Sequence, residues 1–547
     1  MSFRFFLILV EASEGRLRLV VVSPVCSDNI QRERAPGAVE LGPRQPAGAI
    51  GEITWTSEHS SFAMLSKGLW VLKRKNDKRI HFFLGKNVEY AHFFFIILLI
   101  RGCNGEYNRI NCFRGKDLMR RKLMERLLQW KDRKNRKPLI LWGARQTGKT
   151  WILKEFGRSA FSDTVYISFY NNTRIASIFE RDYDVHRILN ALEIELHVRI
   201  RPQETLLIFD EVQGAGKVVE SLKYFCEDAP EYAVAAAGSL LGVALHEGIS
   251  FPVGKVDELR LYPMGFEEFL WAMNEEKLAD YLQQKETDEI NNFRMRYIEL
   301  LRDYFVTGGM PAVVQEFSQT GDYGSVREMQ NSILHQYEGD FGKHIPPQEI
   351  PRVRMVWNSI PVQLAKENKK FFFGQIKKGA RSKEYEAALQ WLEDAGMIYR
   401  IQKVSKPALP LKSYAEPSNF KVYMLDIGLL GALSELDPYV IIHGNNAFVE
   451  FKGALTEQYV FQQLICETTY PLYYFATEKS TYEVDFLLQK DASFAPLEVK
   501  AAENLKSRGL QMFYEKFEPA HCYRTSMSNY REQDWVTNIP LWAIQNL

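Results

Sequence analysis

The pattern of apolar and polar residues becomes regular at Met119. The segment MRRKLMERLLQWKDRK that begins there places Leu123, Leu127 and Leu128 on one face of a helix and surrounds them with Arg and Lys. Such a distribution is typical of an amphipathic helix whose apolar stripe faces a protein core. We therefore predict that the regular part of the chain begins with this helix.

Residues 1–118 follow no comparable pattern. Their apolar runs keep neither the helical nor the strand period, and a Pro/Gly-rich stretch covers residues 35–51. We expect this segment to be a non-native extension that arises from a start codon assigned too far upstream, with Met119 as the natural start. A poorly ordered N-terminal extension is the alternative.

Short apolar strands alternate with helical segments after the first helix. The pattern predicts strands at Pro138–Trp142, Thr164–Phe169, Leu206–Phe209 and Tyr232–Ala237. Strands that alternate with helices in this way are typical of an α/β fold with a parallel sheet. We assign this sheet to residues 119–270.

The pattern from about residue 271 to 400 is mostly helical. A helix is predicted at Tyr385–Ala395, and the strand-like segment Met397–Val404 follows it. Three prolines (Pro407, Pro410 and Pro417) then mark a linker. From Lys421 onward short strands mix with helices, of which Leu455–Ile465 is the clearest. We therefore expect a second α/β region at the C-terminal end.

Composition narrows the class of protein. At about 150 residues per domain, 547 residues correspond to roughly three to four domains. The net charge is +1, so no overall field indicates nucleic acid or membrane as a partner. The six cysteines form no CxxC pair, which argues against a disulfide framework. The apolar runs Phe5–Val10 and Phe93–Ile100 are too short to span a bilayer. We expect a cytoplasmic protein.

The clearest chemical signal is a glycine-rich turn between an apolar strand and a helix. It matches the phosphate-binding pattern GxxxxGK[ST] in the context that this pattern requires. The glycines let backbone N–H groups curl around phosphates, Lys149 reaches the β- and γ-phosphates, and the Thr150 hydroxyl ligates Mg²⁺. The sequence therefore predicts ATP and Mg²⁺ at Gly143, Ala144, Arg145, Gln146, Thr147, Gly148, Lys149 and Thr150.

Polar residues at two further strand ends complete this predicted site. The apolar run LLIF ends in Asp210 and Glu211, at the edge of a parallel sheet where ligands bind. We expect Asp210 to hold Mg²⁺ and Glu211 to polarise the attacking water. Ser239 follows the next strand and is placed to sense the γ-phosphate, although a strand end with a helix cap is an alternative reading.

A second candidate site lies near the C-terminus. If its two charged strands form a hairpin whose turn is centred after Asp491, Asp485 falls opposite Glu498, and Glu483 opposite Lys500. Directly opposed carboxylates repel each other, so that Mg²⁺ or the lysine must compensate. Asp followed by ExK on the next strand is the arrangement of PD-(D/E)XK nucleases, in which two carboxylates hold a metal ion. A solvated hairpin face is the alternative.

One more acidic residue could belong to this site. Glu457 lies on the predicted helix Leu455–Ile465 and is the candidate for the additional acidic ligand that such nucleases often carry. The candidate nuclease residues are Glu457, Asp485, Glu498 and Lys500.

Several segments taken together resemble a known family. WGARQTGKT, IFDEVQ, AAGSLLG, VGKVDELRLYPMGFEEFL and YFVTGGMPAVV are similar to segments of predicted AAA+ ATPases of bacteria and archaea, whose C-terminal half is a domain of unknown function with a restriction-endonuclease-like core. The resemblance runs from Met119 to the end of the chain. It implies an α/β P-loop ATPase domain at 119–270, a helical lid at 271–335, a winged helix at 336–405 with Met397–Val404 as its wing, and a nuclease-like α/β domain at 406–547.

The chain departs from that family at one basic position. The segment that resembles the family's Gly-Arg step reads Gly254-Lys255 here. If the arginine completes the transition state in relatives, Lys255 is a weaker substitute because an ammonium cannot bind a phosphate bidentately. Arg260 is the competing candidate, and solvated charge is the alternative for both.

Three functions therefore stay open. The first is an ATPase that couples hydrolysis to its C-terminal domains. The second is an enzyme that cleaves DNA or RNA with the C-terminal carboxylates and is only regulated by ATP. The third is a slow nucleotide switch that binds a protein partner. The sequence does not decide the oligomeric state.

Overall fold

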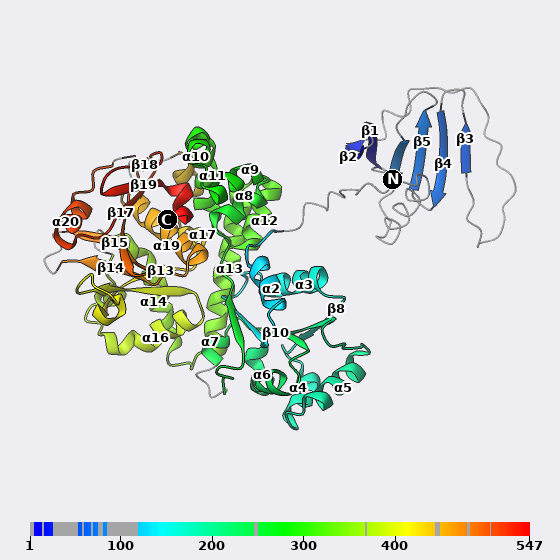
Figure 1. Ribbon diagram of the computed structural model, residues 1–547, viewed down its shortest axis with the longest axis horizontal. Helices are drawn as coiled ribbons and strands as arrows, with labels where there is room; N and C mark the ends of the chain where they lie inside the picture. Colours follow the sequence, from blue (N-terminus) through cyan, green and yellow to red (C-terminus); the bar gives the residue numbers. More distant parts are fainter. Residues whose placement is uncertain are drawn as a thin grey trace. The chain divides into compact units, whose positions relative to one another are not determined.

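The computed structural model describes most of the chain after residue 118 and six strands before it. The chain divides into two compact units, Met1–Leu118 and Met119–Leu547. In the second unit, drawn from cyan to red in Figure 1, short gaps separate the described ranges. These gaps are residues 245–249, 367–368, 444–448, 478–481 and 504.

The first unit contains an antiparallel sheet in the order β2-β1-β6-β5-β4-β3. Its strands are β1 (Phe5–Ser13), β2 (Arg16–Val25), β3 (Ile53–Thr56), β4 (Ser60–Ser66), β5 (Leu69–Arg74) and β6 (Ile80–Leu84). The sequence analysis found no strand period here, because a continuous apolar run such as that in β1 does not alternate. The apolar run 93–100 lies outside the described residues. The non-native extension stays a prediction.

A five-stranded parallel sheet opens the second unit, in the order β11-β7-β10-β9-β8. Its strands are β7 (Leu139–Trp142), β8 (Asp163–Ser168), β9 (Thr205–Asp210), β10 (Ala233–Ala237) and β11 (Asp257–Arg260). The first four were predicted and are confirmed. The edge strand β11 was missed, because its four residues DELR carry three charges and do not read as an apolar strand.

Helices cover both faces of this sheet. They are α2 (Leu123–Lys131), α3 (Lys149–Ala160), α4 (Thr173–Glu180), α5 (Val185–Leu196), η2 (Val212–Gly214), α6 (Gly216–Asp228) and α7 (Leu241–Ala244). Helices α2 and α3 pack on one face, and α4 to α6 on the other. The buried face of α2 holds Leu123, Leu127 and Trp130, whereas Leu128 is 41% exposed. The predicted helix is confirmed, but its buried face contains Trp130 in place of Leu128.

A helical region connects the two sheets of this unit. It comprises α8 (Phe266–Ala272), α9 (Glu276–Gln284), α10 (Thr287–Asn292), α11 (Arg294–Thr307), α12 (Pro311–Thr320), α13 (Tyr323–His344), α14 (Ile350–Leu364), α15 (Phe373–Ile376) and α16 (Ser382–Asp394). The mostly helical pattern predicted from 271 to 400 is therefore confirmed. Within the described residues, every helix is too short or too polar to cross a bilayer.

An eight-stranded sheet, β13-β12-β14-β15-β16-β17-β19-β18, ends the chain. Its strands are β12 (Ile398–Val404), β13 (Ala415–Met424), β14 (Leu472–Ala476), β15 (Glu483–Lys490), β16 (Ser493–Val499), β17 (Cys522–Ser526), β18 (Arg531–Glu532) and β19 (Val536–Pro540). Its helices are η4 (Leu411–Tyr414), α17 (Ile427–Leu433), α18 (Pro438–His443), α19 (Val449–Glu467), α20 (Arg508–Phe517) and η6 (Leu541–Asn546). Helix α19 confirms the helix predicted at 455–465.

The strand expected as a wing belongs to this sheet. β12 pairs antiparallel with β13 and parallel with β14. The boundary expected after residue 405 therefore falls between two paired strands. The expected proline linker is also shorter than predicted, since Pro417 lies inside β13.

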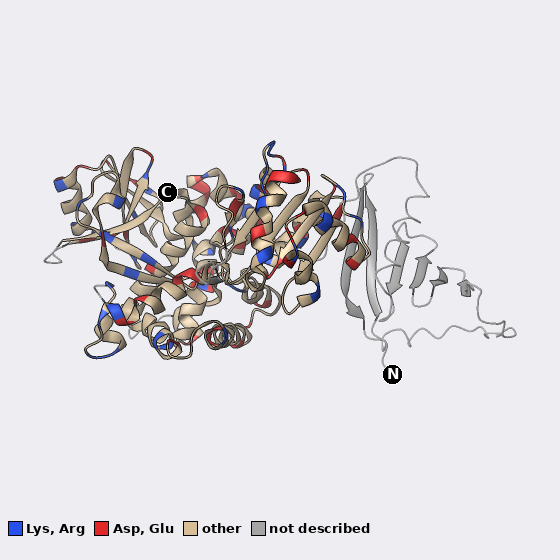
Figure 2. Cartoon of the chain, turned by 90° about the horizontal axis from the view of Figure 1, so that it is seen from below, with Lys and Arg blue, Asp and Glu red and all other residues tan. Residues whose placement is uncertain are grey.

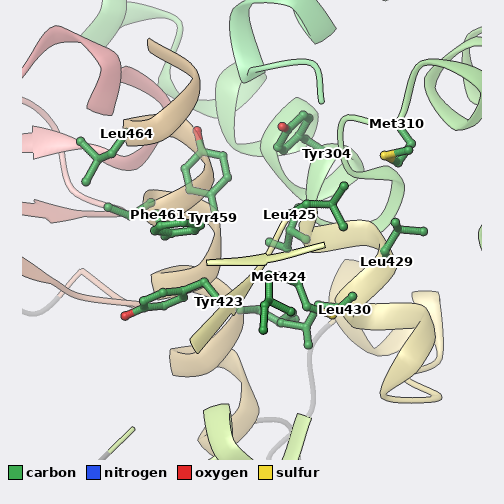
Figure 3. Packing of buried hydrophobic residues seen from close by; sticks show 14 of the residues in the cluster. Tyr304, Met310, Tyr423, Met424, Leu425, Leu429, Leu430, Tyr459, Phe461 and Leu464 are labelled. Atoms are coloured by element: carbon green, nitrogen blue, oxygen red, sulfur yellow. The ribbon is translucent and has the colours of Figure 1, made fainter. Parts of the chain in front are cut away.

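One large apolar core joins the helical region to the C-terminal sheet. Figure 3 shows Tyr304 of α11, Met310, Tyr423 of β13, Leu425 and Tyr459 of α19 as members of this core. Tyr304 and Tyr459 are fully buried, with ring centroids 5.8 Å apart.

Lys/Arg and Asp/Glu are interspersed over the described elements, in keeping with the net charge of +1 (Figure 2).

Candidate functional site

The glycine-rich turn between β7 and α3 has the backbone that phosphate binding requires. Gly143 has a φ of 155°, and a Cβ there would lie 2.5 Å from the carbonyl oxygen of Leu261. Gly148 has a φ of 94° and caps the N-terminus of α3. Both positions favour glycine, because L side chains rarely adopt these backbone angles. The turn thus curls tightly at the positive end of a helix dipole, where anions bind.

Lys149 folds back onto this turn. Its Nζ donates hydrogen bonds to the carbonyl oxygens of Gly143 and Ala144, both at 2.8 Å, and lies 3.4 Å from Ser239 Oγ. Burial lowers the pKa of Lys149 to about 8, although the carboxylates of Glu211 and Asp210 act in the opposite direction. The side chain therefore sits in a buried place that favours a negatively charged ligand.

The two residues expected to hold Mg²⁺ lie together. Thr150 Oγ1 donates a hydrogen bond of 2.6 Å to Asp210 Oδ2, at the C-terminal end of β9. Tyr166 of the neighbouring strand β8 donates to the same oxygen at 3.0 Å. Tyr166 was not predicted, since nothing in its own segment indicates it. Burial, followed by the charge of Asp210, raises the pKa of Tyr166 to about 12, so that it stays a proton donor.

Glu211 and Ser239 flank this pair at neighbouring strand ends. Glu211 has a φ of 57° and accepts a hydrogen bond of 2.5 Å from Gln213 Nε2. Ser239 follows β10, the strand that pairs with both β7 and β9. The predicted P-loop residues, Asp210, Glu211 and Ser239 therefore converge at the C-terminal edge of the sheet.

A cavity of about 360 Å³ opens beside the P-loop. Gly143, Ala144 and Ser239 line it, together with Arg260 at the end of β11 and Tyr399 of β12. Lys255 lies elsewhere and forms an ion pair of 2.8 Å with Glu227. Of the two basic candidates, Arg260 therefore lines the cavity beside the P-loop. Lys255 does not line this cavity, and its ammonium is paired with Glu227.

A buried arginine that precedes helix α2 contacts the P-loop. Arg121 is 6% exposed and donates to the carbonyl oxygens of Thr147 at 3.0 Å and Tyr262 at 2.6 Å. Its Nε lies 3.1 Å from Glu268 Oε2. This residue was not predicted from the sequence, because its partners are 26 to 147 positions away along the chain.

Helix α13 contacts the P-loop from the other side. Arg145 forms an ion pair with Asp340, and Gln146 Nε2 donates to Gln336 Oε1 at 2.6 Å. The hydroxyl of Tyr337 donates to the carbonyl oxygen of Arg145 at 2.8 Å. The middle of the P-loop is therefore tied to a helix that also packs against α14 and α17.

The predicted hairpin register near the C-terminus is confirmed. β15 and β16 pair from Phe486 with Leu497 to Lys490 with Ser493. The next pair in this register is Asp485 with Glu498, and Asp485 Oδ2 accepts a hydrogen bond of 2.8 Å from the backbone N–H of Val499. The turn is thus centred after residue 491, as the spacing of the charges predicted.

Lys421 of β13 lies at the centre of the acidic cluster. Its Nζ is 3.0 Å from Glu457 Oε1, 2.5 Å from Glu483 Oε1 and 4.0 Å from Asp485 Oδ1. Lys369 forms an ion pair with the other oxygen of Glu457. The sequence analysis did not identify either lysine, because both are far from the cluster along the chain.

The other two candidate nuclease residues pair with each other. Lys500 forms an ion pair with Glu498, rather than with the opposing Glu483. Burial and the charge of Glu457 raise the pKa of Asp485 to about 7. Burial would also raise the pKa of Glu457, but Lys369 and Lys421 outweigh it and lower that pKa to about 2. The Glu457 carboxylate therefore has a lowered pKa, whereas the neighbouring Asp485 carboxylate has a raised pKa and keeps its proton to a higher pH.

Three family profiles match separate parts of the chain. Residues 135–270 match the family described as "AAA domain". Residues 298–439 match "Domain of unknown function (DUF8612)", and residues 452–544 match "Domain of unknown function (DUF4143)". The comparison with curated proteins found no match. The profile match, the parallel sheet and the P-loop together support an AAA-type ATPase domain with the P-loop α/β fold.

Three solved structures match parts of this chain. The Walker-type ATPase PABY2304 of Pyrococcus abyssi is 17% identical, covers 58% of this chain and 97% of its own, and gives a TM-score of 0.37. The Orc1 protein of Aeropyrum pernix in complex with DNA is 14% identical, with coverages of 60% and 94% and a TM-score of 0.23. A signal transduction ATPase with numerous domains, the tetratricopeptide-sensor protein PH0952 of Pyrococcus horikoshii, is 13% identical, with coverages of 66% and 47% and a TM-score of 0.24.

Proposed function

We propose that this chain is a Mg²⁺-dependent ATPase of the AAA+ superfamily. The observation that carries the proposal is the 2.6 Å contact between Thr150 Oγ1 and Asp210 Oδ2, beside the buried Nζ of Lys149. A hydroxyl and a carboxylate are the oxygen ligands that Mg²⁺ prefers, so these two side chains fit the ion. When bound, Mg²⁺ would neutralise charge on the β- and γ-phosphates.

Each remaining residue of the site has a role in this proposal. Lys149 binds the β- and γ-phosphates, and the backbone N–H groups of residues 143–150 cradle them. Glu211 polarises the attacking water, and Ser239 senses the γ-phosphate. Within the chain, Arg260 is better placed than Lys255 to stabilise the transition state, because it lines the cavity beside the P-loop.

We extend the proposal to the domains that follow. We propose an ATPase domain at 119–270 and a helical lid at 271–335. In the region expected as a winged helix at 336–405, α14, α15 and α16 precede the antiparallel pair β12–β13, an order that supports a winged helix. Its wing would then include β13 and end at Met424.

The C-terminal domain, expected at 406–547, is proposed to have a nuclease-like core. The element order α19-β14-β15-β16-α20-β17 supports this, since β14 to β16 are antiparallel and β17 joins β16 in parallel. The register of β15 and β16 also places Asp485 beside the ExK segment Glu498–Lys500. We propose that ATP hydrolysis changes how this domain binds DNA, RNA or a protein partner.

Two alternative functions use the candidate residues named above. An ATP-regulated nuclease would use Glu457, Asp485, Glu498 and Lys500. A slow nucleotide switch would bind ATP as tightly but turn it over hardly at all.

Calorimetric ATP titration of the full chain tests the nucleotide site. Lys149→Ala removes the ammonium that contacts the phosphates, so we expect Mg·ATP affinity to fall by at least about 100-fold, or about 2.7 kcal/mol. The matched control is Lys277→Ala, a lysine that is exposed on α9. Equal affinities for the wild type and Lys149→Ala would contradict the proposal.

Phosphate release with and without DNA and RNA separates the three functions. Turnover that nucleic acid stimulates favours a nucleic-acid-processing machine. Turnover that is indifferent to nucleic acid favours a protein partner, and tight ATP binding without turnover favours the switch.

A further inference from the structure

The C-terminal acidic cluster does not fit the metal ion that a nuclease of this shape would need. Both carboxylate oxygens of Glu457 are already bonded, one to Lys421 and the hydroxyl of Tyr423, the other to Lys369. Asp485 has one oxygen on the backbone N–H of Val499. Within the described residues, no group of three or more His, Cys, Asp or Glu side chains is arranged to hold a metal ion.

An ammonium group lies among the carboxylates of this cluster. Lys421 is fully buried, and its Nζ lies between three carboxylates from two elements: Glu457 on α19, and Glu483 and Asp485 on β15. Its Nζ also lies 4.9 Å from the ring centroid of Tyr474 on β14. An ammonium with these neighbours supplies the positive charge that opposed carboxylates require.

The orphaned acidic oxygen of the site does not change this conclusion. Glu498 is 8% exposed, and its Oε2 has no hydrogen-bond partner, while Oε1 pairs with Lys500. Together with Asp485 Oδ1, it leaves two protein oxygens for a divalent cation, and Asp485 Oδ1 already faces the Lys421 ammonium at 4.0 Å. Two lysines beside Glu457 would also repel an added cation.

We infer that Lys421 replaces the divalent cation of the nuclease-like core, so that the wild-type cluster binds no Mg²⁺ or Mn²⁺ and cleaves no phosphodiester bond. This inference rests on the proposed nuclease-like shape of the C-terminal domain. Lys421 is a fixed counter-ion that holds α19 and β15 against β13. The domain therefore acts as a binding module that the ATPase controls, and not as a second catalytic centre.

Mn²⁺ binding to the full chain, measured by electron paramagnetic resonance without nucleotide, tests this directly. A Mn²⁺ site is assigned to the cluster only if Asp485→Asn removes it, which separates it from any Mn²⁺ held near the P-loop. We expect no such site in the wild type. Lys421→Met keeps the length of the side chain but removes its charge, and should create one Mn²⁺ site that the added Asp485→Asn abolishes.

Lys421→Arg is the matched control, because it keeps the positive charge and should create no site. A wild-type Mn²⁺ site that Asp485→Asn removes would overturn the inference, as would a folded Lys421→Met protein that gains no site. If Lys421→Met does not fold, the wild type and Asp485→Asn still decide, since metal-dependent strand cleavage that Asp485→Asn abolishes would also overturn it. None of these outcomes depends on Lys149, so a failure here is distinct from a failure of the proposed ATPase.

Discussion

At the scale of single residues, Lys149 carries the most direct consequence of the site. Its ammonium is buried on the P-loop carbonyls of Gly143 and Ala144, and burial lowers its pKa to about 8. Triphosphate brings negative charge to the same place and therefore raises that pKa. ATP binding and protonation of Lys149 are thus linked.

This linkage predicts a pH dependence of ATP affinity. As the pH rises through about 8, the free protein loses the Lys149 proton and ATP must restore it, so affinity should fall by up to about tenfold per pH unit above that point. Calorimetry between pH 7.5 and 9.5, in buffers of different ionisation enthalpy, should reveal proton uptake. Affinity that is constant over this range would contradict the burial of the Lys149 ammonium.

At the scale of elements, α13 is the contact between the P-loop and the helical region. Tyr337 is fully buried and donates a 2.8 Å hydrogen bond to the carbonyl oxygen of Arg145. This contact joins two elements that are 192 positions apart in the sequence. It offers a route by which the P-loop senses the position of α13.

Removal of this hydrogen bond should loosen the P-loop. Tyr337→Phe keeps the ring but leaves the Arg145 carbonyl without this donor, so we expect the free energy of unfolding to fall by about 0.5–1.5 kcal/mol and ATP affinity to weaken. Denaturant unfolding and ATP titration measure the two effects. Tyr439→Phe, at a ring that is 58% exposed, is the control and should change neither. A Tyr337→Phe protein with the stability and ATP affinity of the wild type would contradict this role of α13.

At the scale of elements, local patterns were enough to predict β7 to β10 and the register of β15 and β16, because apolar runs and charge spacing specify them. They were not enough for β11, a charged edge strand. Arg121 and Lys421 were also missed, since a buried cation is defined by partners that are distant in the sequence and no local signal marks it.

At the scale of the whole molecule, one apolar core of the second unit joins the helical region, which follows the AAA-type ATPase domain, to the C-terminal sheet. That core includes Tyr304 of α11 and Tyr459 of α19 (Figure 3). We therefore expect a movement of the helical region to be transmitted to the C-terminal sheet, because packed cores deform little. This packing is the physical basis on which the proposed function couples ATP hydrolysis to the C-terminal domain.

Mg²⁺-dependent phosphate release by the wild type and by Glu211→Gln tests the proposed ATP hydrolysis most directly. Gln keeps the shape of the side chain but cannot polarise water as a carboxylate does. We expect Mg²⁺-dependent turnover by the wild type, and a Glu211→Gln protein that binds ATP with similar affinity but releases phosphate at least about 100-fold more slowly. Equal turnover by the two proteins, or no wild-type turnover with Mg²⁺ present, would contradict it.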